Sequence, residues 1–335
     1  MYIMKRHLHC LLLCAVVLFL ASCGGSVKIK ALKYSFTAPD GYRVTAYELL
    51  KSKDKTYSRH PRAVVLYIQG SVYESAISKV DKLASTVIFG ARAILVEKRG
   101  CHADSIDLKT AHRYSDKHTW KQDYMLVMDS VLKDVPADVP VILIGASEGG
   151  DLAPPIAKAN PRVTHLILIG SGGGMSQKQE FRYFVQQQPG YMGIRDRRQL
   201  DSVFHDIETS EDDLKMWAGY PYRRWRTYMN DSVLVYLKDL DIPVLMLHGS
   251  ADKSVPVVSA RSLDSALRSE GRSNFTYREY LLADHSFIRT SDNKSLFPYL
   301  ETDMIRWLQT HGVVKDIEAR VFINRVKAHH NELEW

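Results

Sequence analysis

The sequence predicts an α/β protein with a mostly parallel, doubly wound sheet that helices cover on both faces. Two observations lead to this prediction. Short apolar runs alternate with segments of helical length along most of the chain, as they do in repeated strand–helix–strand units. Clusters of polar residues and glycine follow the apolar runs, and in a parallel sheet these strand ends meet at one edge, where active sites collect.

The predicted elements follow one another without an internal repeat. The first strand, residues 42–49, alternates polar and apolar side chains, as an exposed edge strand does. Later strands, mostly buried apolar runs, are expected at residues 63–68, 93–96, 141–144, 163–169, 242–247 and 275–280. Helices are expected at residues 74–89, 115–133, 148–158, 257–269, 296–310 and 313–330. Residues 175–240 interrupt this order and are predicted to form an insertion.

The N-terminal segment predicts export and lipid attachment. A basic start precedes an apolar run at residues 11–20 that is too short to span a bilayer comfortably. The stretch Leu20-Ala21-Ser22-Cys23 resembles the lipobox of bacterial lipoproteins, which implies cleavage after residue 22 and a lipid on Cys23; a plain signal peptide with a chance cysteine is the alternative. We therefore expect a protein of the bacterial cell envelope, anchored to a membrane by acyl chains on the periplasmic side or at the cell surface.

Charge and cysteine content narrow the function further. The formal net charge of +7 falls to about +5 without residues 1–22, which suits a neighbour with anionic head groups and does not indicate nucleic-acid binding. Cys10 and Cys14 leave with the signal peptide and Cys23 carries lipid, so Cys101 has no partner for an internal disulfide. Stability must then come from an apolar core, and a chain of this length can bury a large one.

The pentapeptide Gly145-Ala146-Ser147-Glu148-Gly149 is the clearest functional motif. It lies between the apolar run 141–144 and a helix-compatible segment, which is the context of a nucleophile elbow, where a strand ends, the chain turns sharply and a helix begins. The flanking glycines permit a turn in which a Cβ would clash. The pattern predicts that the Ser147 hydroxyl is presented at the edge of the sheet.

A serine hydroxyl needs a base to take its proton, and the base needs an orienting anion. Asp252 follows the apolar run 242–247, and His285 follows the strand 275–280. The order Ser147, Asp252, His285 at strand ends resembles the α/β-hydrolase family, in particular serine esterases and dienelactone hydrolases, over residues 40–311. The resemblance implies that Ser147 is the nucleophile, His285 the general base and acid, and Asp252 the orienting carboxylate, with no metal or organic cofactor.

Other residues compete for two of these roles. Asp284 is a rival acid, but it adjoins His285 and is poorly placed to reach the far nitrogen of that ring. His248 and His311 are rival bases, and both are interpreted as structural.

The same resemblance implies two backbone N–H donors for the oxyanion, those of Glu148 and Ser71. Many family members have His-Gly before the second donor, where this chain has Gln69-Gly70, so the hydrogen bonding of that loop is open. The Glu148 carboxylate would lie beside the nucleophile, and buried charges usually have a partner. We expect Arg99 or Lys98, at the end of a neighbouring strand, to pair with it.

The insertion at about 175–240 occupies the position at which α/β-hydrolases usually carry a lid. It is rich in aromatic residues, and its charges are sorted by segment and sum to about zero. One interpretation is a set of helices packed through ion pairs and aromatic clusters. The other is that Arg223, Arg224 or Arg226 binds a carboxylate or phosphate of the substrate.

The sequence therefore predicts a serine hydrolase that cleaves an ester, or another acyl bond, of a small molecule through an acyl-enzyme on Ser147. Thioesterase and small-peptide peptidase activity of the same fold stay open, as does a non-catalytic envelope protein that uses the fold for binding. The predicted organisation is a signal peptide at residues 1–22, a tether at residues 23–33 and an α/β-hydrolase domain at residues 34–335.

Overall fold

The computed structural model describes residues 17–19, 28–51, 61–79, 90–188, 190–316, 319–320 and 323–324. Most of the predicted signal peptide, its cleavage site and Cys23 lie outside these residues, as do most of the helix predicted at 74–89 and most of the one at 313–330. Within the described residues, no helix is both long and apolar enough to cross a bilayer.

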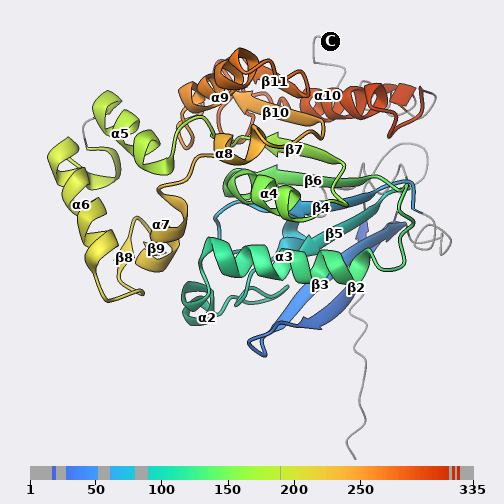
Figure 1. The fold of residues 1–335 in the computed structure, drawn as a ribbon, viewed down its shortest axis with the longest axis horizontal. Helices are drawn as coiled ribbons and strands as arrows, with labels where there is room; N and C mark the ends of the chain where they lie inside the picture. Colours follow the sequence, from blue (N-terminus) through green and yellow to red (C-terminus); the bar gives the residue numbers. More distant parts are fainter. Residues whose placement is uncertain are drawn as a thin grey trace, which may run out of the picture.

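A nine-stranded sheet forms the centre of the molecule, in the order β1-β2-β3-β5-β4-β6-β7-β10-β11 (Figure 1). The antiparallel edge comprises β1 (Val17–Phe19), β2 (Lys28–Thr37) and β3 (Arg43–Lys51). The parallel part comprises β5 (Arg92–Val96), β4 (Val64–Ile68), β6 (Val141–Ala146), β7 (His165–Ile169), β10 (Val244–Gly249) and β11 (Phe275–Tyr280). The prediction of a mostly parallel sheet is confirmed.

Two predictions for the N-terminal edge are wrong. The tether predicted at residues 23–33 gives way at Lys28 to β2, because Ile29 and Ala31 alternate with lysines and bury their side chains against the core. Residues 42–49 are not an edge strand, because β3 pairs with β2 on one side and with β5 on the other.

Helices cover both faces because the central strands are apolar on both. In β4, for instance, Leu66 faces one core and Val65 the other, as successive side chains of a strand do. The first core packs against α3 (Lys117–Val131), α4 (Glu148–Ala159), α8 (Leu234–Leu237) and α9 (Val257–Ser269). The second core packs against α10 (Phe297–Thr310) and η1 (Ala76–Lys79). A short helix, α2 (Leu108–Arg113), precedes α3.

The segment between β7 and α8 forms a separate group of elements beside the sheet (Figure 1). It contains α5 (Gln177–Gln187), η2 (Tyr191–Gly193), α6 (Arg197–Thr209), β8 (Met216–Trp217), β9 (Tyr220–Pro221) and α7 (Tyr222–Tyr228). These elements share a core of their own around Leu200, Phe204 and Trp225. The segment is called the insertion from here on.

Candidate active site

Ser147 lies in a strained turn between β6 and α4. Its backbone angles are φ 54° and ψ −124°, a combination that a non-glycine residue rarely adopts. A Cβ at Gly145 would lie 2.4 Å from the carbonyl oxygen of Gly149, and a Cβ at Gly149 would lie 2.0 Å from that of Ile68. Glycine at both positions therefore allows the close approach that presents the Ser147 hydroxyl between strand and helix.

Three side chains that are far apart in the sequence meet at the carboxyl ends of the strands. His285 lies in the turn after β11, and its Nε2 atom is 3.1 Å from Oγ of Ser147. The opposite ring nitrogen, Nδ1, is 2.7 Å from Oδ2 of Asp252, which follows β10. The structure thus brings the three predicted residues into one hydrogen-bonded chain.

The Asp252 carboxylate is buried and fixed by its own loop. Its Oδ1 atom accepts hydrogen bonds from the backbone N–H groups of Ser254, at 2.7 Å, and Val255, at 2.9 Å. Oδ2 is thereby directed to His285. A carboxylate at Nδ1 favours the tautomer that carries its proton there, which leaves Nε2 free to accept the proton of the Ser147 hydroxyl.

The rival residues have other contacts. Oδ1 of Asp284 accepts from the backbone N–H groups of Ser286 and Ile288, so this carboxylate stabilises the turn that carries His285. His248 is fully buried, and its Nε2 atom lies 3.2 Å from the Val255 carbonyl oxygen. The His311 ring packs against Trp307 at a centroid distance of 4.5 Å.

The two residues expected to supply the oxyanion donors, Glu148 and Ser71, lie beside Ser147 or in the loop that approaches it. Glu148 is the first residue of α4, and the first N–H groups of a helix have no partner within it. From the other side, the loop after β4 approaches so closely that a Cβ at Gly70 would lie 3.6 Å from Oγ of Ser147. Ser71 follows in this loop, and it lines the same cavity as Ser147 and Glu148.

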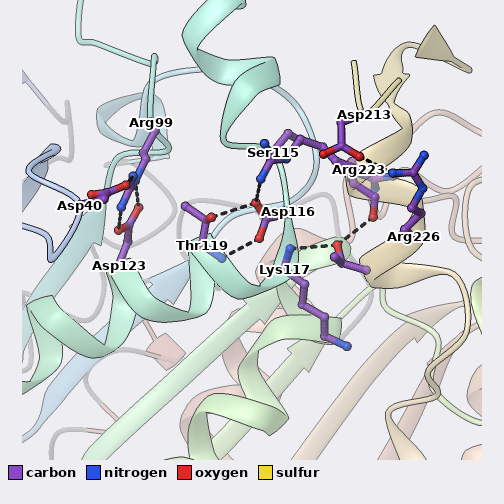
Figure 2. A network of polar contacts seen from close by, with 12 residues as sticks. Asp40, Arg99, Ser115, Asp116, Lys117, Thr119, Asp123, Asp213, Arg223 and Arg226 are labelled. Carbon is purple, nitrogen blue, oxygen red and sulfur yellow. Dashed lines mark hydrogen bonds and ion pairs between the residues drawn. The ribbon is translucent and has the colours of Figure 1, made fainter. Parts of the chain in front are cut away.

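The predicted partner of Glu148 is wrong. Glu148 is buried and pairs with Arg224 of α7. Arg99 instead pairs with two aspartates (Figure 2), and Lys98 contacts backbone carbonyl oxygens. The insertion brings α7 against the first turn of α4, a contact between distant parts of the chain that no local sequence pattern indicates.

The other two arginines of α7 also have protein partners, which Figure 2 shows. Arg223 donates to Asp116, the residue that caps the start of α3, with 2.8 Å between Nη2 and Oδ2. Arg226 pairs with Asp213 within the insertion. Of the three arginines predicted as substrate ligands, Arg224 is the one that lines the cavity.

The Arg224 guanidinium is enclosed by aromatic rings. Its Cζ atom lies 4.2 Å from the ring centroid of Tyr220, 4.3 Å from that of Trp225 and 5.2 Å from that of Tyr228. Burial lowers the pKa of Arg224 to about 10, so the group stays charged at neutral pH. The buried Arg224–Glu148 pair therefore connects the insertion to the helix that begins beside Ser147.

A cavity of about 550 Å³ opens onto Ser147 and His285, within the size range of small-molecule sites. Much of its lining is apolar or aromatic and comes from the strand ends, the insertion and α10. Examples are Phe181, Phe184, Tyr191, Trp225, Phe297 and Leu308.

The cavity lining includes acidic side chains that the sequence analysis missed, among them Asp151 and Glu180. Burial and, to a smaller extent, the neighbouring Asp151 raise the pKa of Glu180 to about 8. Burial also raises the pKa of Asp151, which accepts a hydrogen bond of 3.0 Å from Gln177. Among the described residues, neither forms an ion pair with Lys or Arg. Asp151 could have been found from its place one helical turn after Ser147; the placement of Glu180 depends on the path of the insertion.

Other reactive groups contribute little to the site. No group of three or more potential metal ligands gathers among the residues that the structure describes. Cys101 is buried, and burial raises the pKa of its thiol to about 11, so it is a protonated thiol at neutral pH.

Comparisons with known proteins concern the fold alone. No family model matches the sequence, and no curated protein matches it significantly. A putative dienelactone hydrolase from Klebsiella pneumoniae subsp. pneumoniae MGH 78578 matches with a TM-score of 0.55 and 17% identity, over 84% of this chain and 97% of that chain. The alpha/beta hydrolase GrgF from Penicillium sp. sh18 matches with a TM-score of 0.54 and 12% identity, over 89% and 98%.

A third match is longer than this chain. The acylaminoacyl peptidase from Pyrococcus horikoshii matches with a TM-score of 0.58 and 13% identity, over 84% of this chain and 41% of that chain. The chain thus spans about two fifths of that peptidase. Together the matches show that this chain has the α/β-hydrolase fold, as its sequence predicts.

Proposed function

We propose that this protein is a serine hydrolase that cleaves an ester of a small molecule through an acyl-enzyme on Ser147. The observation that carries the proposal is the chain of contacts from Ser147 through His285 to Asp252, with 3.1 Å and 2.7 Å between the paired atoms. These three residues lie at the strand ends of an α/β-hydrolase fold, beside an aromatic cavity, which supports the same conclusion.

The proposed reaction has two halves. Ser147 Oγ attacks the acyl carbon while His285 Nε2 takes its proton, and His285 then gives that proton to the leaving alcohol. Water, deprotonated by His285, releases the acid from the acyl-enzyme in the same way. Asp252 keeps the imidazole oriented and stabilises its charged form, and the N–H groups of Ser71 and Glu148 stabilise the oxyanion.

Labelling with a fluorophosphonate tests the proposal. We expect covalent labelling of Ser147 in the wild-type protein, located by mass spectrometry, and none in Ser147→Ala. Turnover of p-nitrophenyl esters should be lost in the same variant at unchanged thermal stability. A wild-type protein that is neither labelled nor active would instead support a non-catalytic envelope protein that uses the cavity for binding.

A second candidate is cleavage of an amide or peptide bond in a substrate that carries an amine. The acidic wall of the cavity favours it, because Asp151 and Glu180 line the cavity and form no ion pair with Lys or Arg among the described residues, and a bound ammonium group would favour their charged forms. Activity on aminoacyl p-nitroanilides, p-nitrophenyl esters and acyl-CoA thioesters distinguishes peptidase, esterase and thioesterase. In Glu180→Gln, the ratio of anilide to ester turnover should fall; an unchanged ratio would argue against an amine site.

We also propose that Cys23 carries a lipid that anchors the protein in the bacterial cell envelope, on the periplasmic side or at the cell surface. The support is the Leu20-Ala21-Ser22-Cys23 sequence after a short apolar run. Metabolic labelling with an alkynyl fatty acid should mark the wild-type protein and not Cys23→Ser, which should also leave the membrane fraction. Equal labelling of both would contradict the proposal.

A further inference from the structure

Lys98 is a buried basic residue at the edge of the active site. It lies two residues beyond the end of β5 and is 5% exposed. Its Nζ atom lies 4.3 Å from the ring centroid of Trp120 and 5.9 Å from that of Tyr73. No carboxylate in the described part of the chain pairs with it, and burial lowers its pKa to about 7. An ammonium group without a counterion destabilises a protein interior, so its presence calls for a role.

In the described part of the chain, the hydrogen bonds of the Lys98 side chain are all with the loop after β4. Its Nζ atom donates to the carbonyl oxygens of Gly70 and, at 3.3 Å, Val72. The Gly70 carbonyl and the Ser71 N–H belong to the same planar, trans peptide unit, so they point in opposite directions. A cation on the oxygen therefore fixes the direction of the N–H on the other side.

Few other described side chains hold the loop after β4 in place. The side-chain nitrogen and oxygen of Gln69 are buried and have no hydrogen-bond partner among the residues that the structure describes, so no described group anchors the loop through them. Further along, Glu97 accepts hydrogen bonds from the Ser75 hydroxyl and, at 2.7 Å, from the Ala76 N–H. Glu97 and Lys98, the two residues after β5, thus bind the loop after β4 at two points. Lys98 binds the part of the loop that lies beside Ser147.

We propose that Lys98 is a positioning residue that directs and polarises the Gly70–Ser71 peptide as an oxyanion donor. The ammonium group draws electron density toward the Gly70 oxygen, which makes the Ser71 N–H a stronger donor. This role rests on the proposed function of Ser147, because the Ser71 N–H would contact the oxyanion that forms when Ser147 is acylated. It also provides the anchoring of the loop that the Gln69 side chain does not.

Three variants test the role: Lys98→Met, Lys98→Arg, and Lys117→Met as a matched control. Lys117 is also a buried lysine near an aromatic ring, but it pairs with Asp231 and does not line the cavity. Loss of a whole oxyanion donor costs about 10²–10³-fold in kcat. Since Lys98→Met misdirects the donor without removing it, we expect a fall of about 30-fold in kcat for p-nitrophenyl acetate, with KM within about twofold.

Lys98→Arg keeps a charged donor and should recover most of the lost kcat, whereas Lys117→Met should leave kcat within about threefold. Thermal unfolding of Lys98→Met should not fall below that of the wild type, because the change removes an unpaired buried charge. Should Lys98→Met fail to fold, Lys98→Gln, which keeps a neutral donor, should show the same split between kcat and KM.

Three outcomes would overturn the role, and they are distinguishable. If the wild type is active and labelled at Ser147 while Lys98→Met keeps its kcat, Lys98 does not position the donor. If the wild type is neither active nor labelled by a fluorophosphonate, the proposed function fails and the role of Lys98 fails with it. A parallel loss of kcat and thermal stability, which Lys98→Arg does not recover, would show a structural role only.

Discussion

The strand ends and the insertion are built from different interactions, although both line the cavity. The strands behind Ser147 are apolar on both faces, and Leu66, Leu143 and Leu166 are completely buried. The insertion has a small aromatic core and many ion pairs that are partly exposed, such as Arg226–Asp213 and Lys215–Asp206. The sheet therefore holds Ser147, His285 and Asp252 at fixed distances from one another. The insertion supplies part of the cavity wall, and its residues can change without moving these three.

The two regions are joined where α7 approaches the starts of two core helices. Arg224 pairs with Glu148 at the start of α4, and Arg223 pairs with Asp116 at the start of α3. The first contact is buried and the second is partly exposed. Glu148 directly follows Ser147 in the sequence. The Arg224–Glu148 ion pair therefore connects the insertion to the proposed catalytic site. Substitutions in either region show how independent the two are.

The largest effect is expected at the strand ends, from Asp252→Asn. The amide cannot hold the imidazole in the tautomer that accepts the Ser147 proton, so kcat should fall by about 10³-fold or more. Steady-state kinetics on p-nitrophenyl esters measures this change, and circular dichroism should show an intact fold. Asp284→Asn is the control, because Asp284 stabilises the turn of His285 by accepting from backbone N–H groups; an equal loss there would make Asp284 the acid.

In the insertion, Trp225→Ala should mainly lower stability. Trp225 is 4% exposed, packs against Trp217 at a centroid distance of 5.0 Å and donates its indole N–H to the Trp217 carbonyl. Removing a buried aromatic side chain costs about 3–5 kcal/mol. Chemical denaturation should show this loss while Ser147 is still labelled under native conditions. Leu66→Ala in the sheet is the matched control. If Trp225→Ala and Leu66→Ala reduce the labelling of Ser147 equally, the insertion and the sheet unfold together and are not independent.

A smaller effect, which depends on pH, is expected from Glu180 of α5. Burial raises its pKa to about 8 from an ordinary value of 4.5, so the folded protein binds more protons than the unfolded chain between these values. The free energy of unfolding should therefore decrease as pH rises through this window. Denaturation at several pH values should show a flatter profile for Glu180→Gln. If the unfolding free energy of wild type and Glu180→Gln depends on pH in the same way, Glu180 is not buried in the way described.

The smallest effect is expected from Arg226→Gln. Asp213, its partner, has a side chain that is 56% exposed, and exposed ion pairs contribute about 0–1 kcal/mol. The unfolding free energy should change by less than about 1 kcal/mol, and KM for anionic and neutral esters should change equally. A rise in KM for anionic esters alone would show that Arg226 binds the substrate.

Much of the fold could be predicted because its signals are local. The strand 275–280 and the helix 257–269 have the predicted bounds, since a short apolar run or a helical period is contained in a few residues. The edge of the sheet was less predictable. Ile29 and Ala31 in β2 are separated by lysines that resemble a tether, and only pairing with β3 makes this segment a strand.

By itself, the sequence determined the fold class and the three residues from which a triad could be built, because a strand–turn–helix motif and the order of strand ends are properties of the chain. Only the tertiary structure decided which charges meet. Glu148 pairs with Arg224 and not with Arg99, and Lys98 contacts the loop that carries Ser71. The physical reason is that a buried charge selects its partner by distance after packing, and elements far apart in the sequence set that distance.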